Sequence, residues 1–117
     1  MAVFQESSED AHVLKVLELV RRRPGMYLGP PGVQSLRNFI SGLETSRFVQ
    51  GASPSFLQRD KPDFGAWIAQ REKVRYSPSC GWAEAIQAHA DTPEQELKAF
   101  FSHLDEFVRE FGIGSTA

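Results

Sequence analysis

Hydrophobic residues recur along most of this chain at intervals of three and four positions, which is the spacing of one face of an α-helix. The pattern predicts helices at about residues 10–22, 33–49, 60–76, 80–89 and 93–111. Clean alternation of apolar and polar residues, which is typical of a strand, is missing apart from an ambiguous segment at 73–76. We therefore predict an all-α fold, a compact bundle of about five helices. Residues 1–9 are expected to form a loosely held arm, and Asp10 to cap the first helix.

The last predicted helix carries the strongest local signals. Thr92 and Gln95 have the spacing of a capping box, Pro93 suits the first helical position, and Gly112 suits the C-cap. The apolar stripe of this helix consists of Leu97, Phe100, Phe101, Leu104, Phe107, Val108 and Phe111. Because the chain also contains nine Phe, two Trp and two Tyr, we predict an aromatic-rich core with this helix at its centre.

Length and charge narrow the class of protein. We expect residues 1–117 to form a single helical domain, because this length can bury one core. The net charge of -2 gives no reason to expect binding to nucleic acid or to an anionic membrane. No apolar run approaches the roughly 20 residues that span a bilayer, and the acidic start of the chain is unlike a signal peptide. A single cysteine can form no internal disulfide, and together these features favour a cytoplasmic protein.

Residue types that bind metals or catalyse reactions form no constellation in the sequence. The histidines His12, His89 and His103 fall on different predicted helices, none in a His-x-x-x-His pair, so we predict no metal site. His89 lies on an apolar face and is expected to be a core residue. Cys80 follows Ser79, the expected cap of the fourth helix. It is expected to be a buried structural cysteine, because a catalytic thiol also needs a base and the sequence places neither His89 nor His103 beside it. We therefore predict no catalytic residue, no cofactor and no enzymatic activity.

The segment that joins the first two predicted helices has an unusual composition. Residues 23–32 contain three of the seven prolines and three of the nine glycines, which predicts a rigid, shaped turn. Its structural frame is expected to comprise Pro24, Gly25, Gly29 and Pro30. Large side chains on a stiff frame lose little entropy on binding, which makes this turn a candidate partner-binding site. The candidate binding residues are Arg22, Arg23, Met26, Tyr27 and Leu28, and the alternative is that Met26 and Tyr27 fold back onto the helical core.

The arginines Arg21, Arg22 and Arg23 allow two interpretations. Cations are favoured at the C-terminal end of any helix, and this explanation needs no ligand. The other interpretation is a phosphate or nucleotide site formed by the Arg21–Arg23 cluster and the N-terminus of the following helix. The sequence of the turn is not that of a P-loop, and no predicted strand precedes it.

Residues 20–29, Val-Arg-Arg-Arg-Pro-Gly-Met-Tyr-Leu-Gly, resemble the segment that precedes the ATP-binding helix in the gyrase B subunit and its type II topoisomerase relatives. In that family the next helix carries a Glu and, four residues later, an Asn that holds magnesium. Gly42 and Ser46 stand at the corresponding positions here, and the later Asp-x-Gly-x-Gly motif is missing. The resemblance implies a similar turn and no ATPase activity.

Most of the chain resembles a group of small bacterial proteins that share an Arg-Pro-Gly-Met-Tyr-Leu/Ile-Gly turn. The other shared features are a Phe-x-x-Trp element at Phe64 and Trp67, a second Trp at position 82, and a final Phe-Phe-x-x-Leu-x-Glu-Phe helix. Some of these proteins resemble immunity proteins, which bind and block one cognate bacterial toxin. The resemblance implies a protein partner such as a toxin domain, with carboxylates meeting a basic toxin surface and aromatic side chains filling a pocket. The resemblance implies no particular oligomeric state.

Overall fold

The chain folds into α-helices joined by loops, and the all-α prediction is confirmed. The computed structural model describes residues 2–77 and 81–114, with side chains from residue 9 onward. Six helices and no strand occur in these residues. The helices are α1 (Ala2–Arg22), α2 (Pro24–Leu28), α3 (Val33–Val49), α4 (Phe64–Arg71), α5 (Trp82–Gln87) and α6 (Pro93–Phe111).

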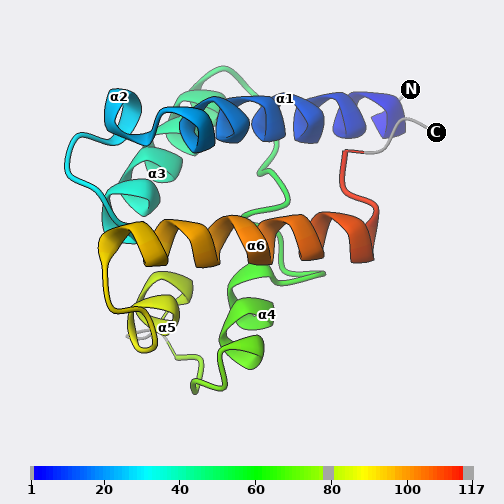
Figure 1. Ribbon diagram of the computed structural model, residues 1–117. Coiled ribbons are helices and arrows are strands. Elements are labelled where there is room, and N and C mark those ends of the chain that lie inside the picture. Colours follow the sequence, from blue (N-terminus) through cyan, green and yellow to red (C-terminus); the bar gives the residue numbers. More distant parts are fainter. Residues whose placement is uncertain (1, 78–80, 115–117) are drawn as a thin grey trace.

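Helix α6 crosses the middle of the molecule. Helices α1, α2 and α3 lie on one side of it, and α4 and α5 lie on the other (Figure 1). Helices α1 and α6 run in opposite directions, so the start of α1 and the end of α6 are at the same end of the molecule, and α2 is at the other end (Figure 1). This central position explains why the apolar stripe of α6 is wide, because it packs against elements on both sides.

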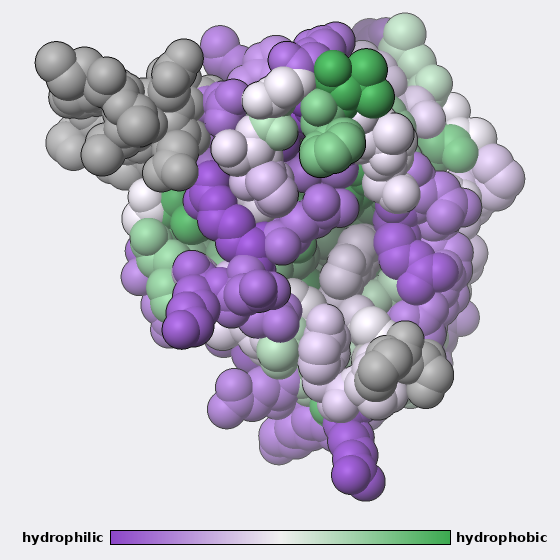
Figure 2. All heavy atoms as spheres, turned by 180° about the vertical axis from the view of Figure 1, so that it is seen from behind, coloured by the Kyte–Doolittle hydropathy of each residue, from purple (hydrophilic) through white to green (hydrophobic). Residues whose placement is uncertain are grey.

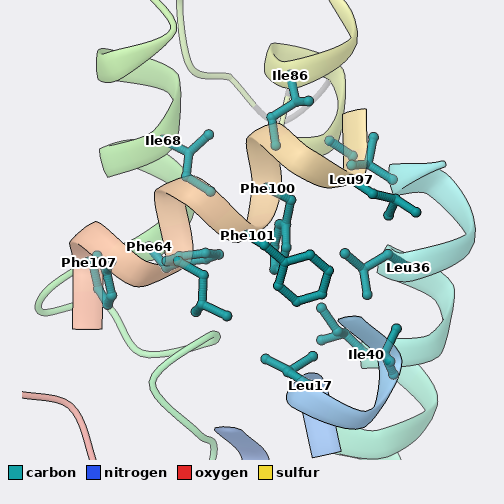
Figure 3. Close-up of a cluster of buried hydrophobic side chains, with 14 of the residues drawn as sticks. Leu17, Leu36, Ile40, Phe64, Ile68, Ile86, Leu97, Phe100, Phe101 and Phe107 are labelled. Carbon is teal, nitrogen blue, oxygen red and sulfur yellow. The ribbon is translucent and has the colours of Figure 1, made fainter. Parts of the chain in front are cut away.

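The core between these elements is aromatic, as predicted. The stripe of α6 contributes Leu97, Phe100, Phe101, Leu104 and Phe107, all of which are buried. Phe101 points toward Leu17 of α1 and toward Leu36 and Ile40 of α3 (Figure 3). On the other side of α6, the ring of Phe64 lies edge-on to the ring of Phe107, with 4.9 Å between the ring centres. Edge-on packing at this separation is one of the two favoured arrangements of aromatic rings.

The first helix begins earlier than the sequence suggested. Residues 2–9, for which we expected a loosely held arm, belong to α1, because no glycine or proline interrupts residues 2–22. Asp10 is therefore not an N-cap. Its carboxylate is buried inside the molecule, where it accepts two hydrogen bonds of 2.9 and 3.0 Å from Arg59 and one from the backbone N–H of Phe56.

Helix α4 is shorter than its hydrophobic pattern. It begins at Phe64 because Asp63 is its N-cap, whose side chain accepts a hydrogen bond from the N–H of Ala66 at 3.0 Å. It ends at Arg71, two residues before Lys73 takes a φ of 59°, a value that a helix does not allow. The ambiguous segment at 73–76 belongs to no helix and to no strand of the described chain.

The prediction for helix α6 is confirmed at both ends. The Thr92 hydroxyl accepts the N–H of Gln95 at 3.1 Å, Pro93 is the first helical residue, and Gly112 is a left-handed C-cap. The capping box differs in one partner, because the Gln95 side chain accepts the N–H of Asp91, at 2.9 Å, in place of that of Thr92. Of the expectations for the fourth helix, the cap at Ser79 and the burial of Cys80 lie outside the described residues.

Candidate functional site

The proline- and glycine-rich turn is a short helix between two bends. Pro24 ends α1, because it lacks a backbone N–H and disfavours a helical conformation of the residue before it. It then takes the first position of α2, where the missing N–H costs nothing. Helix α2 stops at Leu28 because Gly29 adopts a φ of +71°. The segment for which we expected a turn is thus the short helix α2, in addition to the five predicted helices. Pro24 and Gly25 lie inside it, and Gly29 and Pro30 lie in the loop that follows.

A hollow of about 280 Å³ lies where α1 meets α2. We call the five residues that line it the α1–α2 corner: Leu19, Arg22, Arg23, Met26 and Tyr27. The apolar members are unusually exposed for their size, at 49% for Leu19, 69% for Met26 and 38% for Tyr27. Four of the five binding candidates predicted from the sequence are therefore brought together around one hollow.

The remaining candidate, Leu28, has a different place. Its side chain is half-buried and packs against the hydrophobic core, so it fixes α2 to the rest of the fold. Tyr27 is held as well, since its ring meets that of Phe39 edge-on at 6.4 Å between centres. The sequence also allowed that Met26 and Tyr27 both fold back onto the core. The Tyr27 ring does contact Phe39, but Met26 remains at the surface.

Leu19 is the corner residue that the sequence analysis missed. It stands between Leu17 and Val20, which are buried on the apolar stripe of α1, and points away from that stripe. A leucine outside the stripe of an amphipathic helix is a signal that could have found it, although single exposed leucines are common.

The charge around the α1–α2 corner is positive. Residues 19–43 include four arginines, Arg21, Arg22, Arg23 and Arg37, and no aspartate or glutamate. Arg37 binds Glu84 on α5, at 3.0 Å, and Arg22 lies 3.6 Å from Glu18. Arg23 takes part in none of the ion pairs of the described residues. Arg22 and Arg23 therefore supply the charge at the rim of the hollow.

Arg21 points away from its two neighbours. Its guanidinium donates to both carboxylate oxygens of Asp105 on α6, at 2.9 and 3.0 Å, and lies 5.3 Å from the centre of the Phe101 ring. The hydrogen bonds to Asp105 raise the pKa of Arg21, although partial burial opposes the shift. The three arginines thus do not converge on one ligand position.

The N-terminus of α3 is already capped by a carboxylate. Glu96 of α6 accepts the N–H of Val33 through Oε1, with an N···O distance of 3.1 Å. A carboxylate in this position is favoured by the helix dipole in the same way as a phosphate. The anion position that a phosphate would need at this helix end is consequently occupied by the protein itself.

Replacing Gly32 by alanine should lower the free energy of unfolding by about 2 kcal/mol. Gly32 has a φ of +114°, and an added Cβ would lie 2.9 Å from Oε1 of Glu96, so the cap on Val33 would have to move. Urea unfolding followed by circular dichroism measures the change. Gly42→Ala is the matched control: its Cβ would enter open space within α3, and about 0.5–1 kcal/mol of added stability is expected. Equal effects of the two variants would contradict the described start of α3.

Glu84 joins α3 to α5. Its carboxylate accepts hydrogen bonds from Gln34 at 2.7 Å and from the N–H of Gly81 at 3.0 Å, besides the contact with Arg37. Burial alone would raise the pKa of Glu84. The hydrogen bonds from Gln34 and from the backbone of Glu84 and Gly81, together with the charge of Arg37, outweigh burial and hold this pKa below its usual 4.5.

Glu84→Gln should therefore flatten the loss of stability in acid. A lowered carboxylate pKa stabilises the fold above the unfolded-state value of 4.5, and this contribution disappears as pH falls through the folded-state value. Melting temperatures measured from about pH 5 to about pH 3 should drop less steeply in the variant, which should also be less stable at neutral pH. Glu106→Gln, in an exposed pair with Arg109, should follow the wild-type profile. Parallel curves for wild type and Glu84→Gln would refute the assignment.

A second cluster of titratable residues connects α4 and α6. Glu72 contacts Nε2 of His103 at 2.5 Å through one oxygen and Nδ1 of His89 at 3.2 Å through the other. Arg71 donates its Nε–H to Nδ1 of His103, at 3.3 Å. Both ring nitrogens of His103 and both oxygens of Glu72 are thereby engaged, which suits a structural tie between the helices.

His89 differs from its prediction. It follows the end of α5 and its ring is exposed, so the expectation of a core residue is wrong. The periodicity that suggested burial continues beyond Gln87, where the helix has already ended. The hollow beside His89 has a volume of about 130 Å³, and none of its lining residues is a serine, threonine or cysteine that could act as a nucleophile.

Among the described residues, no three histidine, cysteine or acidic side chains are arranged to hold a metal ion. None of the described helices combines the length and apolar character needed to cross a bilayer.

Comparison of the chain with protein families, curated proteins and solved structures gives no match.

Proposed function

We propose that this chain is a non-catalytic protein-binding module of the immunity type, which binds a bacterial toxin domain through the α1–α2 corner and blocks it by covering its active site. The observation that carries the proposal is the exposure of Leu19, Met26 and Tyr27 around one hollow beside Arg22 and Arg23. Aromatic residues, methionine and arginine are enriched at the centres of protein interfaces. The toxin as partner comes from the resemblance of residues 23–29 and of the aromatic elements to immunity-type proteins.

The frame beneath the corner supports this mode of binding. Pro24 fixes the start of α2, Leu28 packs against the core, and Tyr27 rests on Phe39. A surface that is already ordered before binding loses little conformational entropy on association. Blocking a toxin in this way needs shape and charge only, so the proposal requires no catalytic group.

The rest of the described surface offers a weaker candidate. Seen from behind, the molecule is mainly hydrophilic, with small and separate hydrophobic areas (Figure 2). Phe48 and Val49, at the end of α3, are the most exposed large hydrophobic residues among the described side chains. The hollow beside Phe48, of about 220 Å³, is otherwise lined by the polar residues Ser41, Glu44, Thr45 and Gln58. An interface centre is depleted of such charged and polar side chains, which favours the corner.

The proposal requires that a gene next to that of this chain encodes a toxin domain, and co-purification with that domain tests it. The double substitution Met26→Ala/Tyr27→Ala should weaken binding about tenfold or more, because it truncates two anchors of the hollow, and should weaken protection from the toxin in growing cells. Phe48→Ala, which removes a more exposed ring elsewhere on the surface, should bind normally. Absence of any complex with that domain would count against the proposed function, and full binding by the double variant would count against the corner.

The alternative function, a regulator that binds a nucleotide or phosphate through Arg21–Arg23, has less support from the geometry. Arg21 is bound to Asp105, and Glu96 caps α3. Calorimetry with ATP and polyphosphate tests it. Saturable binding that disappears in Arg23→Ala would favour this alternative, and no heat at millimolar nucleotide would remove it.

A further inference from the structure

We infer that the α1–α2 corner receives an acidic, apolar peptide segment of its partner: one large apolar side chain enters the hollow, and a neighbouring carboxylate binds Arg22 and Arg23. The inference rests on the proposed function and specifies the chemistry of the partner. It also differs from the sequence expectation that carboxylates of this chain meet a basic toxin surface.

The size and the lining of the hollow indicate that it receives an apolar side chain. A cavity of about 150 Å³ lined by apolar side chains is enough to hold a benzene ring. The hollow at the corner has about 280 Å³, and Leu19, Met26 and Tyr27 supply its apolar surface. One leucine- or phenylalanine-sized side chain fits this space. Methionine and tyrosine suit the task, because the first adapts its shape and the second offers a flat, rigid face.

The local charge indicates that the partner segment also carries a carboxylate. The net charge of -2 describes the whole chain, but residues 19–43 contain arginines and no carboxylate. Two of these arginines, Arg21 and Arg37, are bound to Asp105 and Glu84. Arg22 has a single partner at 3.6 Å and Arg23 has no ion-pair partner in the described chain. A guanidinium can form two parallel hydrogen bonds with a carboxylate, so an acidic residue complements this rim.

Other occupants fit the corner less well. If two copies of this chain packed corner to corner across a two-fold axis, Arg22 and Arg23 of both copies would come close together and repel one another. A free phosphate would satisfy the arginines and leave Leu19, Met26 and Tyr27 exposed. A peptide with an acidic and an apolar residue side by side satisfies both parts of the surface.

Selection of short random peptides displayed on phage, against the immobilised full chain, tests the inference without a toxin. The enriched peptides should carry Asp or Glu within a few positions of a large apolar residue. A synthetic copy of the best peptide should bind Arg22→Glu/Arg23→Glu about tenfold or more weakly, and Met26→Ala/Tyr27→Ala similarly. Affinity should also fall as salt concentration rises. Arg109→Glu, which reverses an exposed charge on α6, should leave binding unchanged.

The possible failures are distinguishable. Enriched peptides without acidic residues, equal binding by Arg22→Glu/Arg23→Glu, or no enrichment at all would each overturn the inference. Arg22→Gln/Arg23→Gln, a milder change at two exposed positions, replaces the reversed variant if circular dichroism shows that the latter is not folded. A toxin domain that binds equally well to the reversed variant would overturn the inference and leave the proposed function standing. Peptide binding as described, without a toxin complex, would remove the proposed toxin and keep the acidic partner.

Discussion

Replacing Phe64 by alanine is expected to lower the free energy of unfolding by about 3–5 kcal/mol. Phe64 is fully buried, and its ring contacts the rings of Phe107, Phe100, Phe56 and Trp82, with 4.9, 5.9, 6.3 and 6.4 Å between ring centres. These four rings come from α6, α5 and the loop before α4, and each is itself packed. They cannot close the space left by the lost ring, so the variant keeps a cavity.

The measurement is urea or thermal unfolding followed by circular dichroism. A domain of this kind has a total stability of about 5–15 kcal/mol, so a loss of about 3–5 kcal/mol removes a large part of it. Phe48→Ala is the control, because Phe48 is 75% exposed and its loss should change stability by about 0.5 kcal/mol or less. A loss below about 1 kcal/mol in Phe64→Ala would mean that the ring is not central to the core.

Glu44→Ala should cost about 3 kcal/mol for a different reason. Glu44 is buried, lies 3.3 Å from Nη1 of Arg47, and accepts the N–H of the buried Ser55 at 3.2 Å. The Arg47 side chain is nine-tenths buried, and its Nη2 has no hydrogen-bond partner in the described chain, with Glu9 at 3.7 Å. Removing the carboxylate would leave a buried cation and a buried N–H without their main partner, and such a loss costs far more than a surface pair.

Two variants separate charge from hydrogen bonding at this position. Glu44→Gln keeps an acceptor for the N–H of Ser55 and loses the charge, so its stability should lie between that of wild type and of Glu44→Ala. Glu106→Ala breaks an exposed pair with Arg109 at 2.9 Å and should cost about 0.5 kcal/mol or less. If urea unfolding shows that Glu44→Ala loses no more stability than Glu106→Ala, the hydrogen bonds of Glu44 do not stabilise the loop at Ser55.

The parts of the fold that the sequence predicted well depend on local chemistry. Helix α3 spans Val33–Val49 as its periodicity indicated, and the ends of α6 follow from Thr92 and Gly112. A cap or a proline acts on residues three or four positions away, so one sequence contains the whole interaction. The same reasoning failed for Asp10, because a carboxylate that could cap a helix was instead used by Arg59, far along the chain.

The parts that the sequence could not predict depend on contacts between distant residues. Phe56 is fully buried although it lies in a loop, and it is held by the carboxylate of Asp10, which stands 46 positions earlier. No periodic pattern marks such a residue, because a loop buries one side chain and not a stripe. The candidate site could be predicted only in part, for the same reason. Composition located the rigid turn, but the exposure of Met26 and the position of Leu19 beside it depend on how α2 packs against α1.

The placement of residues 2 and 114, where the described chain begins and ends, has a practical consequence for handling this protein. Gly114 lies against Ala11 and Leu14 in the middle of α1, and α2 follows the far end of that helix (Figure 1). A fluorescent dye, an affinity tag or a sensor-chip linker attached beside residue 2 or residue 114 would therefore lie away from Met26 and Tyr27. Immobilised samples should keep that face turned outward, whichever end carries the attachment.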